Sequence, residues 1–257
     1  ADALNRKRFF ERNNTMSSSD KVFLVTGVTG GIGSATAAWL AKQGAKLVIS
    51  GRNQAKLDEA AKLIAAEAAS DTQIKTVTMD MTCEDSVKDG MDKALAAFGK
   101  LNTLINIPGM SIPGKITETE LDSYRTMMDV NITSVFLAAK HFVPKVNAQE
   151  GGHIINISSV AGKAANPNAP IYCTAKAAMN MLSAGLALQL KANNIRVSIV
   201  SPGATSTAGF WGDRPVPHDK FLKVDEVALV IGFVATLPQS IVLHDVVVEP
   251  WEFYRSK

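Results

Sequence analysis

Several features that would point to other classes of protein are scarce or missing in this sequence. It has two cysteines, Cys83 and Cys173, which lie 90 residues apart without metal-ligand spacing and so indicate a reducing compartment. No apolar run approaches the roughly 18 residues that span a bilayer. The net charge is only +3 and the basic residues are scattered among acidic ones, which argues against nucleic acid or a membrane surface as a partner. No metal site is predicted, because the histidines show no ligand spacing: His141, His153, His218 and His244.

The first twenty residues differ in composition from the rest of the chain. They hold a short basic and aromatic stretch and then a polar one, without the apolar core of a secretory signal. We expect residues 1–20 to be a leader or tail outside the core fold, with Met16 as one candidate for a native start. A cytoplasmic location is expected, and an organellar one is the alternative if this segment is a trimmed transit peptide.

From Lys21 onward, signals for strands and helices alternate, and a chain of 257 residues is most simply one domain. Such alternation forces parallel pairing, because each crossover helix returns the chain to the same end of the sheet. The sequence therefore predicts a single α/β domain over residues 21–257, with a doubly wound, seven-stranded parallel sheet and helices on both faces. The expected strands are residues 22–26, 46–49, 74–79, 101–107, 153–157, 196–200 and 240–248. The expected helices are residues 32–42, 54–69, 82–98, 132–148, 171–192 and 227–237, with start signals at Thr82-x-x-Asp85 and, for one more helix, at Thr117-x-x-Glu120.

A glycine-rich turn, Thr26–Gly33, joins the first strand to the first helix, which is the context that a phosphate-binding turn requires. Gly27 permits the tight turn, Gly31 lets the backbone approach a pyrophosphate, and Gly33 lets the helix pack close to the sheet. The N-terminus of that helix faces the anion. The turn therefore predicts a dinucleotide site, with Thr29 and Ile32 among its further contacts.

The end of the second strand indicates which dinucleotide binds. An NAD site would place Asp or Glu there for the ribose hydroxyls, whereas this chain has Gly51 followed by Arg52. A guanidinium can pair with a 2′-phosphate through two hydrogen bonds. We therefore predict NADP(H), with NAD(H) less favoured. The alternative is that Arg52 is a solvent-facing loop residue.

Tyr172 and Lys176 form a reactive pair, since residues four apart lie on one face of a helix. A nearby ammonium is expected to lower the tyrosine pKa from about 10 and so suit the phenol to proton transfer near neutrality. Ser159 stands at the end of the preceding strand, on the edge of the sheet where ligands bind, and its hydroxyl could hold a substrate oxygen. These three residues predict a site for hydride transfer coupled to proton transfer.

Taken together, these motifs resemble the short-chain dehydrogenase/reductase family, in its single-domain branch of about 250 residues, from Lys21 to Pro250. The resemblance implies Asn131, Ser159, Tyr172 and Lys176 as catalytic residues. It implies cofactor contacts from the following residues: Gly27, Thr29, Gly31, Ile32, Gly33, Arg52, Asp80, Met81, Asn106, Tyr172, Lys176, Pro202, Gly203 and Thr207. The family's paired helices imply a homodimer or homotetramer through the small-residue face that ends at Gly185, although packing of that face against the sheet is the alternative.

The chain departs from the family pattern after the fourth strand, where Ile107 and Pro108 stand between Asn106 and Gly109. Pro108 removes a backbone donor and Ile107 removes an amide side chain, so cofactor binding could be altered there. The substrate pocket is expected to form from the loops at residues 110–115, 161–168 and 204–223. Ser159 and Tyr172 are predicted substrate contacts, and Phe210 and Trp211 either line this pocket or simply pack.

The resulting hypothesis is an NADP(H)-dependent carbonyl reductase or alcohol dehydrogenase that acts on a small molecule. Ser159 would hold the carbonyl oxygen, Tyr172 would exchange a proton with it, Lys176 would lower the tyrosine pKa, and Asn131 would order the water that resupplies protons. Two alternatives remain. One is an isomerase or epimerase that uses bound cofactor, and the other is a nucleotide-binding sensor or scaffold without turnover.

Overall fold

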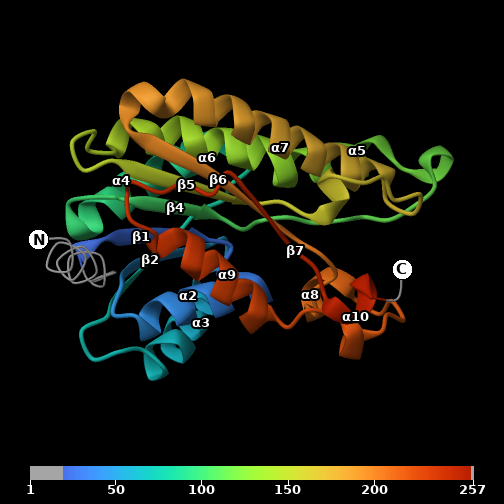
Figure 1. Cartoon of the computed structure of the whole chain (residues 1–257), viewed down its shortest axis with the longest axis horizontal. Helices are drawn as coiled ribbons and strands as arrows, with labels where there is room; N and C mark the ends of the chain where they lie inside the picture. Colours follow the sequence, from blue (N-terminus) through green and yellow to red (C-terminus); the bar gives the residue numbers. More distant parts are fainter. Residues whose placement is uncertain (1–19, 256–257) are drawn as a thin grey trace, which may run out of the picture.

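The computed structural model describes residues 20–255, so the predicted leader lies outside the described residues except for Asp20. The described chain forms one parallel sheet of seven strands in the order β3-β2-β1-β4-β5-β6-β7. The strands are β1 (Val22–Thr26), β2 (Lys46–Gly51), β3 (Gln73–Thr78), β4 (Thr103–Asn106), β5 (Gly152–Ile157), β6 (Ile195–Pro202) and β7 (Asp245–Val248). Helices cover both faces (Figure 1), which confirms the predicted doubly wound fold.

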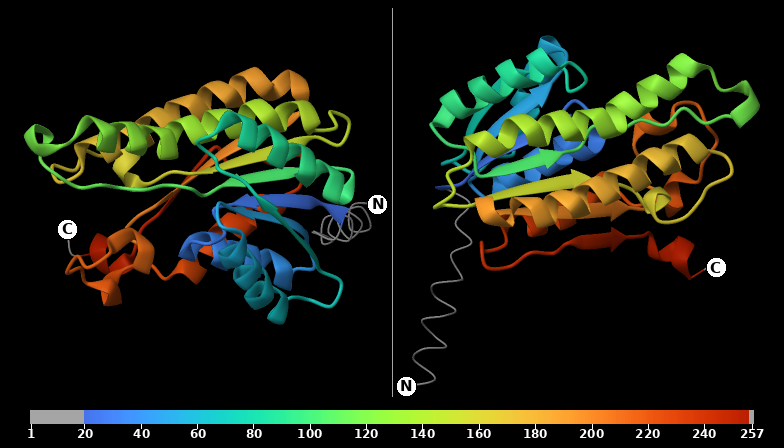
Figure 2. Two further views of the ribbon diagram at one scale, coloured as in Figure 1. Left: turned by 180° about the vertical axis from the view of Figure 1, so that it is seen from behind. Right: turned by 90° about the horizontal axis from the view of Figure 1, so that it is seen from above.

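The main helices form two layers, one on each side of the sheet (Figures 1 and 2). One layer contains α2 (Gly31–Lys42), α3 (Gln54–Ala66) and α9 (Val224–Thr236), and the other contains α4 (Glu84–Phe98), α6 (Ser134–Phe142) and α7 (Pro170–Gln189). The shorter helices are η2 (Ile116–Glu118), α5 (Leu121–Met128), η3 (Asp129–Thr133), η4 (Val143–Lys145), η5 (Val160–Gly162), η6 (Leu190–Asn193), α8 (Ala208–Trp211), η7 (His218–Lys220) and α10 (Trp251–Tyr254). Among the described residues, no helix is both long and apolar enough to cross a membrane.

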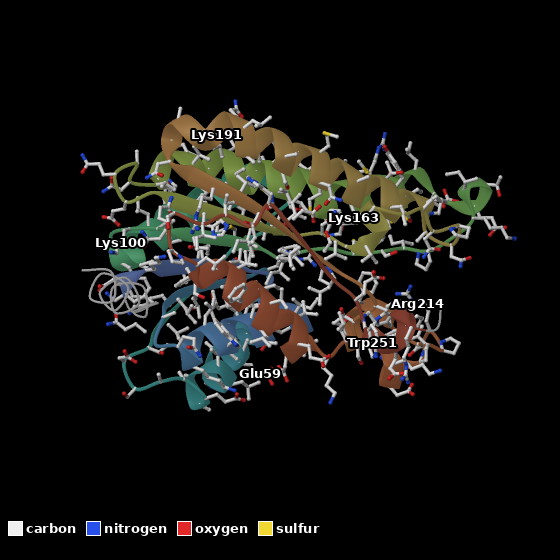
Figure 3. All side chains as sticks on the ribbon, in the orientation of Figure 1. Glu59, Lys100, Lys163, Lys191, Arg214 and Trp251 are labelled. Atoms are coloured by element: carbon white, nitrogen blue, oxygen red, sulfur yellow. The ribbon has the colours of Figure 1, made fainter. Side chains whose placement is uncertain are left out.

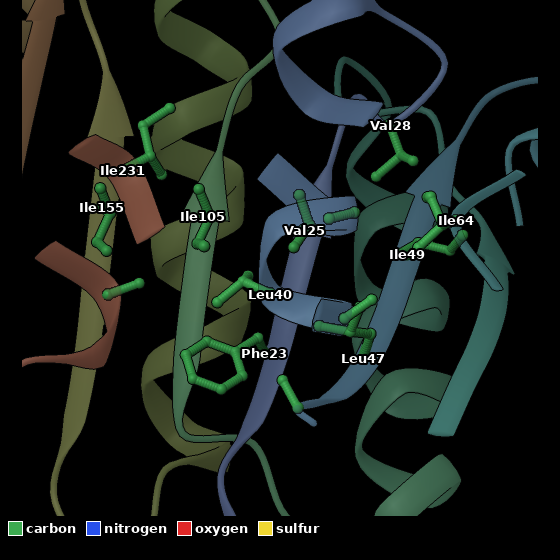
Figure 4. Packing of buried hydrophobic residues seen from close by; sticks show 14 of the residues in the cluster. Phe23, Val25, Val28, Leu40, Leu47, Ile49, Ile64, Ile105, Ile155 and Ile231 are labelled. Carbon is green, nitrogen blue, oxygen red and sulfur yellow. The ribbon is translucent and has the colours of Figure 1, made fainter. Parts of the chain in front are cut away.

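Strand β1 shows why the sheet needs cover on both faces. Alternate side chains of a strand point to opposite faces, and here both sets are apolar and buried. Phe23 and Val25 pack in the cluster under α2, α3 and α9 (Figure 4), whereas Val22 and Leu24 pack in the cluster under α4 and α6. The core therefore consists of two layers, with the sheet between them.

Strand order reverses at β1, which pairs with β2 on one side and with β4 on the other. The chain that leaves β1 enters α2, whereas the chain that leaves β4 runs toward the opposite helical layer. Loops that diverge in this way open a crevice at the carboxyl edge, and ligands of open α/β sheets bind there. The fold thus places the loops after β1, β4, β5 and β6 around one crevice.

Helices α2 and α9 approach each other closely where Gly232 faces Trp39. A Cβ atom at Gly232 would lie 2.1 Å from Cε3 of the Trp39 indole, well inside van der Waals contact. Glycine inside a helix costs about 1 kcal/mol relative to alanine. Its presence here follows from packing, because the indole fills the space that a methyl group would need.

Both predicted helix-start signals are wrong. The Thr82 hydroxyl donates to Asp80 Oδ1 at 2.7 Å instead of capping a helix, and α4 begins after Cys83, which makes no side-chain cap. Thr117 lies inside η2, and α5 begins after Glu120 without a side-chain cap. In the first case a nearby carboxylate competes for the hydroxyl, and local hydrogen bonds of this kind often replace caps.

Two predicted elements are shorter than expected. The helix predicted for residues 132–148 begins as a π-type turn in η3, continues as α6 and ends in η4, where Pro144 has no backbone donor. The strand predicted for residues 240–248 pairs with β6 only from Asp245 onward, although the His244 carbonyl oxygen still accepts from Ile199 N. Neither difference moves the carboxyl edge of the sheet.

Candidate active site

A pocket of about 410 Å³ opens at the carboxyl edge of the sheet. Its walls come from the ends of β5 and β6, from the first turns of α7, and from the loops after β4 and β6. The predicted residues that line it are Ile32, Ser159, Tyr172, Lys176, Pro202, Gly203, Thr207, Phe210 and Trp211. The three predicted pocket loops all contribute, so residues far apart in the sequence meet at one cavity.

Two of the predicted catalytic residues, Ser159 and Tyr172, lie together in the pocket. Ser159 lies two residues beyond Ile157, the last residue of β5, and its Oγ accepts a hydrogen bond from Ala161 N at 3.1 Å. The Ser159 hydroxyl also hydrogen-bonds the phenol of Tyr172, whose helix α7 begins at Pro170. Proline suits the first helical turn, because its missing N–H would have no partner there. Strand end and helix start thus bring the two hydroxyls together.

Lys176 lies one helical turn beyond Tyr172 and is 2% exposed. Its Nζ donates to the Ile157 carbonyl oxygen at 2.9 Å and lies 5.8 Å from the centroid of the Tyr172 ring. Burial lowers the pKa of Lys176 to about 7. The lysine is therefore held beside the tyrosine with its charge weakened by desolvation.

The expected lowering of the Tyr172 pKa is wrong for this structure. Burial raises the pKa of Tyr172 to about 12, and the hydrogen bond from Ser159 opposes that shift only in part. Desolvation disfavours the phenolate, and the Lys176 amine, hydrogen-bonded to the strand, does not offset it. The phenol therefore holds its proton at neutral pH.

Asn131 is fully buried in the π-type turn η3. Its Nδ2 donates to the carbonyl oxygens of Met110 and Met127, each at 2.8 Å, so it ties the loop after β4 to α5. Gly109 lies between Asn131 and Lys176: a Cβ there would be 3.2 Å from Asn131 Oδ1 and 3.1 Å from Lys176 Nζ. The predicted catalytic residues Asn131 and Lys176 are thus neighbours across one glycine.

The glycine turn has the shape that a phosphate cradle requires. Gly27 has a φ of +73°, a backbone region that favours glycine, and Pro108 packs against it. A Cβ at Gly33 would lie 2.3 Å from the Gly27 carbonyl oxygen, so this position has no room for a side chain. Helix α2 begins after Gly30 without a side-chain cap, which leaves its first N–H groups free to meet an anion.

Arg52, the residue predicted to bind the 2′-phosphate of NADP(H), lies just beyond the carboxyl end of β2. Arg52 is exposed, and a Cβ at Gly51 would lie 3.0 Å from the Thr29 Cγ2 methyl group. Asp80 accepts hydrogen bonds from the Thr82 backbone and hydroxyl; these bonds hold its pKa below its usual value, and Arg52 adds to the effect. Arg52 is therefore placed near the Asp80 carboxylate at the rim of the crevice.

Other predicted cofactor residues do not line the pocket. Asn106 is buried, with its Nδ2 donating to Asn156 Oδ1 at 2.8 Å, so its side chain bridges β4 and β5. Met81 is buried in the core under α4. Beyond the pocket's walls, toward the second strand, lie Gly27, Thr29, Gly31, Gly33, Arg52 and Asp80.

Aromatic rings form part of the pocket wall. The ring centroids of Tyr172 and Phe210 are 5.8 Å apart, and those of Phe210 and Trp211 are 5.3 Å apart. The series continues from Trp211 to Phe221 at 5.0 Å and from Phe221 to Phe253 in α10 at 5.7 Å. Phe210 and Trp211 therefore line the pocket and also pack, so both predicted readings apply.

Sequence reasoning missed several residues of the pocket wall, among them Arg214. Figure 3 shows Arg214 in the region of α8 and α10, and its side chain lines the pocket at the carboxyl edge of the sheet. The sequence signal was the spacing of Arg214, four residues after Phe210 and three after Trp211, which suits one face of a short helical turn. Its direction into the pocket depends on the loop and could not be read from the spacing. Among the described residues, no group of histidine, cysteine and carboxylate side chains could hold a metal ion.

Comparison with known proteins defines the class of the chain. The model of the short chain dehydrogenase family matches residues 21–215, so the chain belongs to that family. An uncharacterized oxidoreductase of Staphylococcus aureus (strain MRSA252) is 33% identical over 232 residues, covering 90% of this chain and 98% of the relative. Another, from Staphylococcus saprophyticus, is 32% identical and covers 90% and 97%. The chain is thus an oxidoreductase of this family.

Solved structures agree in fold. A short-chain dehydrogenase/reductase from Mycobacterium ulcerans superposes with a TM-score of 0.84 at 26% identity, covering 92% of this chain and 90% of that one. A metagenomic short-chain oxidoreductase in complex with NADP gives 0.77 at 28% identity, covering 91% and 98%. An alcohol dehydrogenase from Thermococcus sibiricus, complexed with 5-hydroxy-NADP, gives 0.83 at 24% identity, covering 90% and 97%.

Proposed function

We propose that the protein is an NADP(H)-dependent oxidoreductase that interconverts a carbonyl group and a primary or secondary alcohol on a small molecule. One observation carries this proposal: Ser159, Tyr172 and Lys176 meet on one pocket, at the edge of the sheet where the glycine turn lies. A hydroxyl pair beside a buried amine suits proton exchange with a substrate oxygen. The family membership supports the same class of reaction.

The residues present fit a dinucleotide. Gly27 has a positive φ that favours glycine, Gly33 has no space for a side chain, and the N-terminus of α2 offers unpaired N–H groups to a pyrophosphate. Thr207 reaches the same turn, since its Cγ2 would lie 3.5 Å from a Cβ at Gly31. When bound, the cofactor would supply a hydride to a carbonyl carbon or accept one from an alcohol carbon. Ile32, Pro202 and Gly203 would lie along its nicotinamide half.

Preference for NADP(H) over NAD(H) is proposed from the end of β2. Gly51 provides no carboxylate for the ribose hydroxyls, and the exposed guanidinium of Arg52 is available to a 2′-phosphate. Asp80 and Met81 would lie on the adenine side. A structural neighbour of 28% identity was solved in complex with NADP, which supports the same choice here.

The raised pKa of Tyr172 suits the direction of carbonyl reduction. A phenol that holds its proton at neutral pH can give it to the substrate oxygen as negative charge develops there. Ser159, which already hydrogen-bonds the phenol, would hold that oxygen in place. Lys176 would pair with the phenolate once the proton has left, and Asn131 would position the loop and the water through which protons are resupplied.

The proposed assembly is a homodimer or homotetramer. Met181 and Leu188 on α7 are 75% and 68% exposed, and they flank Gly185 on a groove of that helix. Apolar side chains gathered on one helix face favour contact with a second copy. A cytoplasmic location remains a prediction from the cysteine content.

The test is loss of absorbance at the reduced-nicotinamide band, with NADPH and NADH side by side over a panel of ketones, aldehydes, oxo acids and quinones. Turnover that prefers NADPH is the expected result. Tyr172→Phe should reduce kcat by at least about 100-fold, the lower range for general acid–base catalysis, and leave NADPH affinity within about twofold. A preference for NADH would contradict only the proposed role of Arg52 and would leave the proposed reaction unaffected.

Two other functions make different predictions in the same assay. A sensor or scaffold would bind NADPH tightly and turn over no compound of the panel. An isomerase or epimerase would convert substrate without net change in nicotinamide absorbance. The size of the pocket disfavours isomerisation or epimerisation. A sugar nucleotide would have to fit a pocket of about 410 Å³ together with the nicotinamide half of the cofactor.

A further inference from the structure

The wall of the pocket carries a guanidinium, that of Arg214. Its carbon lies 5.6 Å from the centroid of the Phe210 ring and 4.9 Å from that of Trp211. Its Nε donates to the Trp211 carbonyl oxygen at 2.7 Å, and its Nη2 donates to the Phe210 carbonyl oxygen. Two rings and two backbone acceptors therefore fix the guanidinium plane before any ligand arrives.

These contacts leave much of the donor capacity of Arg214 unused. A guanidinium has five N–H groups, and the hydrogen bonds found among residues 20–255 employ Nε and Nη2 but not Nη1. Within the same residues, Arg214 forms no ion pair with a carboxylate. The side chain is half-buried, so its charge is partly removed from water without a counter-ion.

The charged side chains that line the pocket also favour an anionic ligand. Of the described residues that line it, Lys176 and Arg214 are basic and none is acidic. Lys176 is directed to the Ile157 carbonyl oxygen and the tyrosine, whereas Arg214 lies on the substrate side, beyond Phe210. An anion on the substrate would therefore meet attraction at one end of the pocket and no carboxylate repulsion along its walls.

We propose that Arg214 is a specificity-determining residue that binds a carboxylate of the substrate, so that the preferred substrates are oxo acids and the corresponding hydroxy acids. Within the described chain, one N–H of Nη1 and the second N–H of Nη2 remain free and are parallel, so they match the two oxygens of a carboxylate. The inference rests on the proposed function, because it names the substrate class of that site. The carboxylate takes no part in bond making or bond breaking.

The geometry also bears on where the carboxylate stands in the substrate. The centroid of the Phe210 ring lies 5.8 Å from the centroid of the Tyr172 ring and 5.6 Å from the guanidinium carbon of Arg214. A carbonyl held at the Tyr172 hydroxyl and a carboxylate held at Arg214 would be joined by a chain that crosses the Phe210 ring. Oxo acids with several carbons between the two groups therefore fit this arrangement better than 2-oxo acids.

The experiment compares 4-oxopentanoate and 6-oxoheptanoate with their methyl esters, using NADPH and the wild-type protein, Arg214→Gln, Arg214→Lys and, as a control, Arg255→Gln. Arg255 is an exposed arginine of the same C-terminal region and pairs with Glu252. For Arg214→Gln we expect kcat/KM for the acids to fall by about tenfold to a hundredfold, the range of a charge-assisted pair, and that for the esters to stay within about twofold. Arg214→Lys should recover part of the loss, and Arg255→Gln should match the wild type.

Equal losses for acids and esters in Arg214→Gln would overturn the proposal, because they would show that Arg214 only supports α8. A wild-type preference for the esters would overturn it as well. If the wild type reduces none of these compounds, the proposed function fails in this assay, and binding decides the role of Arg214 separately. Pentanoate should then quench tryptophan fluorescence in the wild type but not in Arg214→Gln, since Trp211 lies against the guanidinium; absence of quenching in the wild type would overturn the proposal.

Discussion

The glycine turn allows a sharp test of the cofactor site through the substitution Gly33→Ala. The added Cβ would lie 2.3 Å from the Gly27 carbonyl oxygen and 2.8 Å from the Gly27 carbonyl carbon. The closest ordinary carbon–oxygen contacts are about 3.3 Å, so the turn must open by about 1 Å. The groups it meets are backbone atoms, which cannot rotate away as the end of a side chain could.

A displacement of that size moves the N–H groups that we propose to hold the pyrophosphate. Loss of one charge-assisted hydrogen bond corresponds to a rise in the dissociation constant of NADPH of about tenfold to a hundredfold. The measurement is titration of NADPH by its fluorescence, with the thermal midpoint of each variant recorded without cofactor to separate affinity from stability.

Gly30→Ala is the matched control, because it adds the same methyl group to the same turn. Its Cβ would meet the Gly27 carbonyl oxygen at 3.5 Å, an ordinary contact, and its φ of −98° suits alanine. We expect its NADPH affinity to remain within about threefold of the wild type, since a contact of this length costs little. If Gly33→Ala binds NADPH as tightly as Gly30→Ala, the cradle geometry does not control binding and the reasoning is refuted.

Three further predictions concern the cofactor choice, the core and the pH dependence of stability. Arg52→Ser should lower the preference for NADPH over NADH by about tenfold to a hundredfold, measured as the ratio of kcat/KM values; an unchanged ratio would assign Arg52 to the solvent-facing surface. Gly232→Ala should destabilise the fold by about 1–3 kcal/mol in denaturant unfolding, with partial recovery in a Trp39→Leu background; additive effects would contradict the contact. Burial and then Arg196 hold the pKa of His153 well below 6.5, so the folded state resists protonation; the free energy of unfolding should be fully retained above about pH 6.5 and should decline below it, and His153→Gln should flatten that decline.

The sequence predicted the architecture well, because burial on both faces leaves a strong signal in strands such as Phe23–Val25 and Ile154–Ile155. It also predicted that Ser159, Tyr172 and Lys176 meet, since a strand end followed by a helix start constrains their positions. It failed where two local hydrogen bonds compete, as at Thr82, whose hydroxyl binds Asp80 instead of capping α4.

Other features of the site depend on contacts that no local pattern contains. The direction of the Tyr172 pKa depends on how far tertiary packing excludes water from the phenol, and a neighbouring lysine in the sequence does not reveal that. Arg214 enters the pocket because the rings of Phe210 and Trp211 and two carbonyl oxygens orient it. These are properties of a folded loop, whereas the spacing of its residues indicates only that they share a face.

The row of aromatic rings from Tyr172 through Phe210, Trp211 and Phe221 to Phe253 has a consequence for how substrate choice can evolve. It joins the last helix of the described chain to the wall of the pocket, although Phe253 is 81 positions from Tyr172 in the sequence. Substitutions at Phe253 can therefore alter the shape of the pocket wall while Ser159, Tyr172 and Lys176 stay unchanged. If the proposed roles hold, the residues proposed for proton transfer and the residues that shape the pocket can thus change independently of each other in evolution.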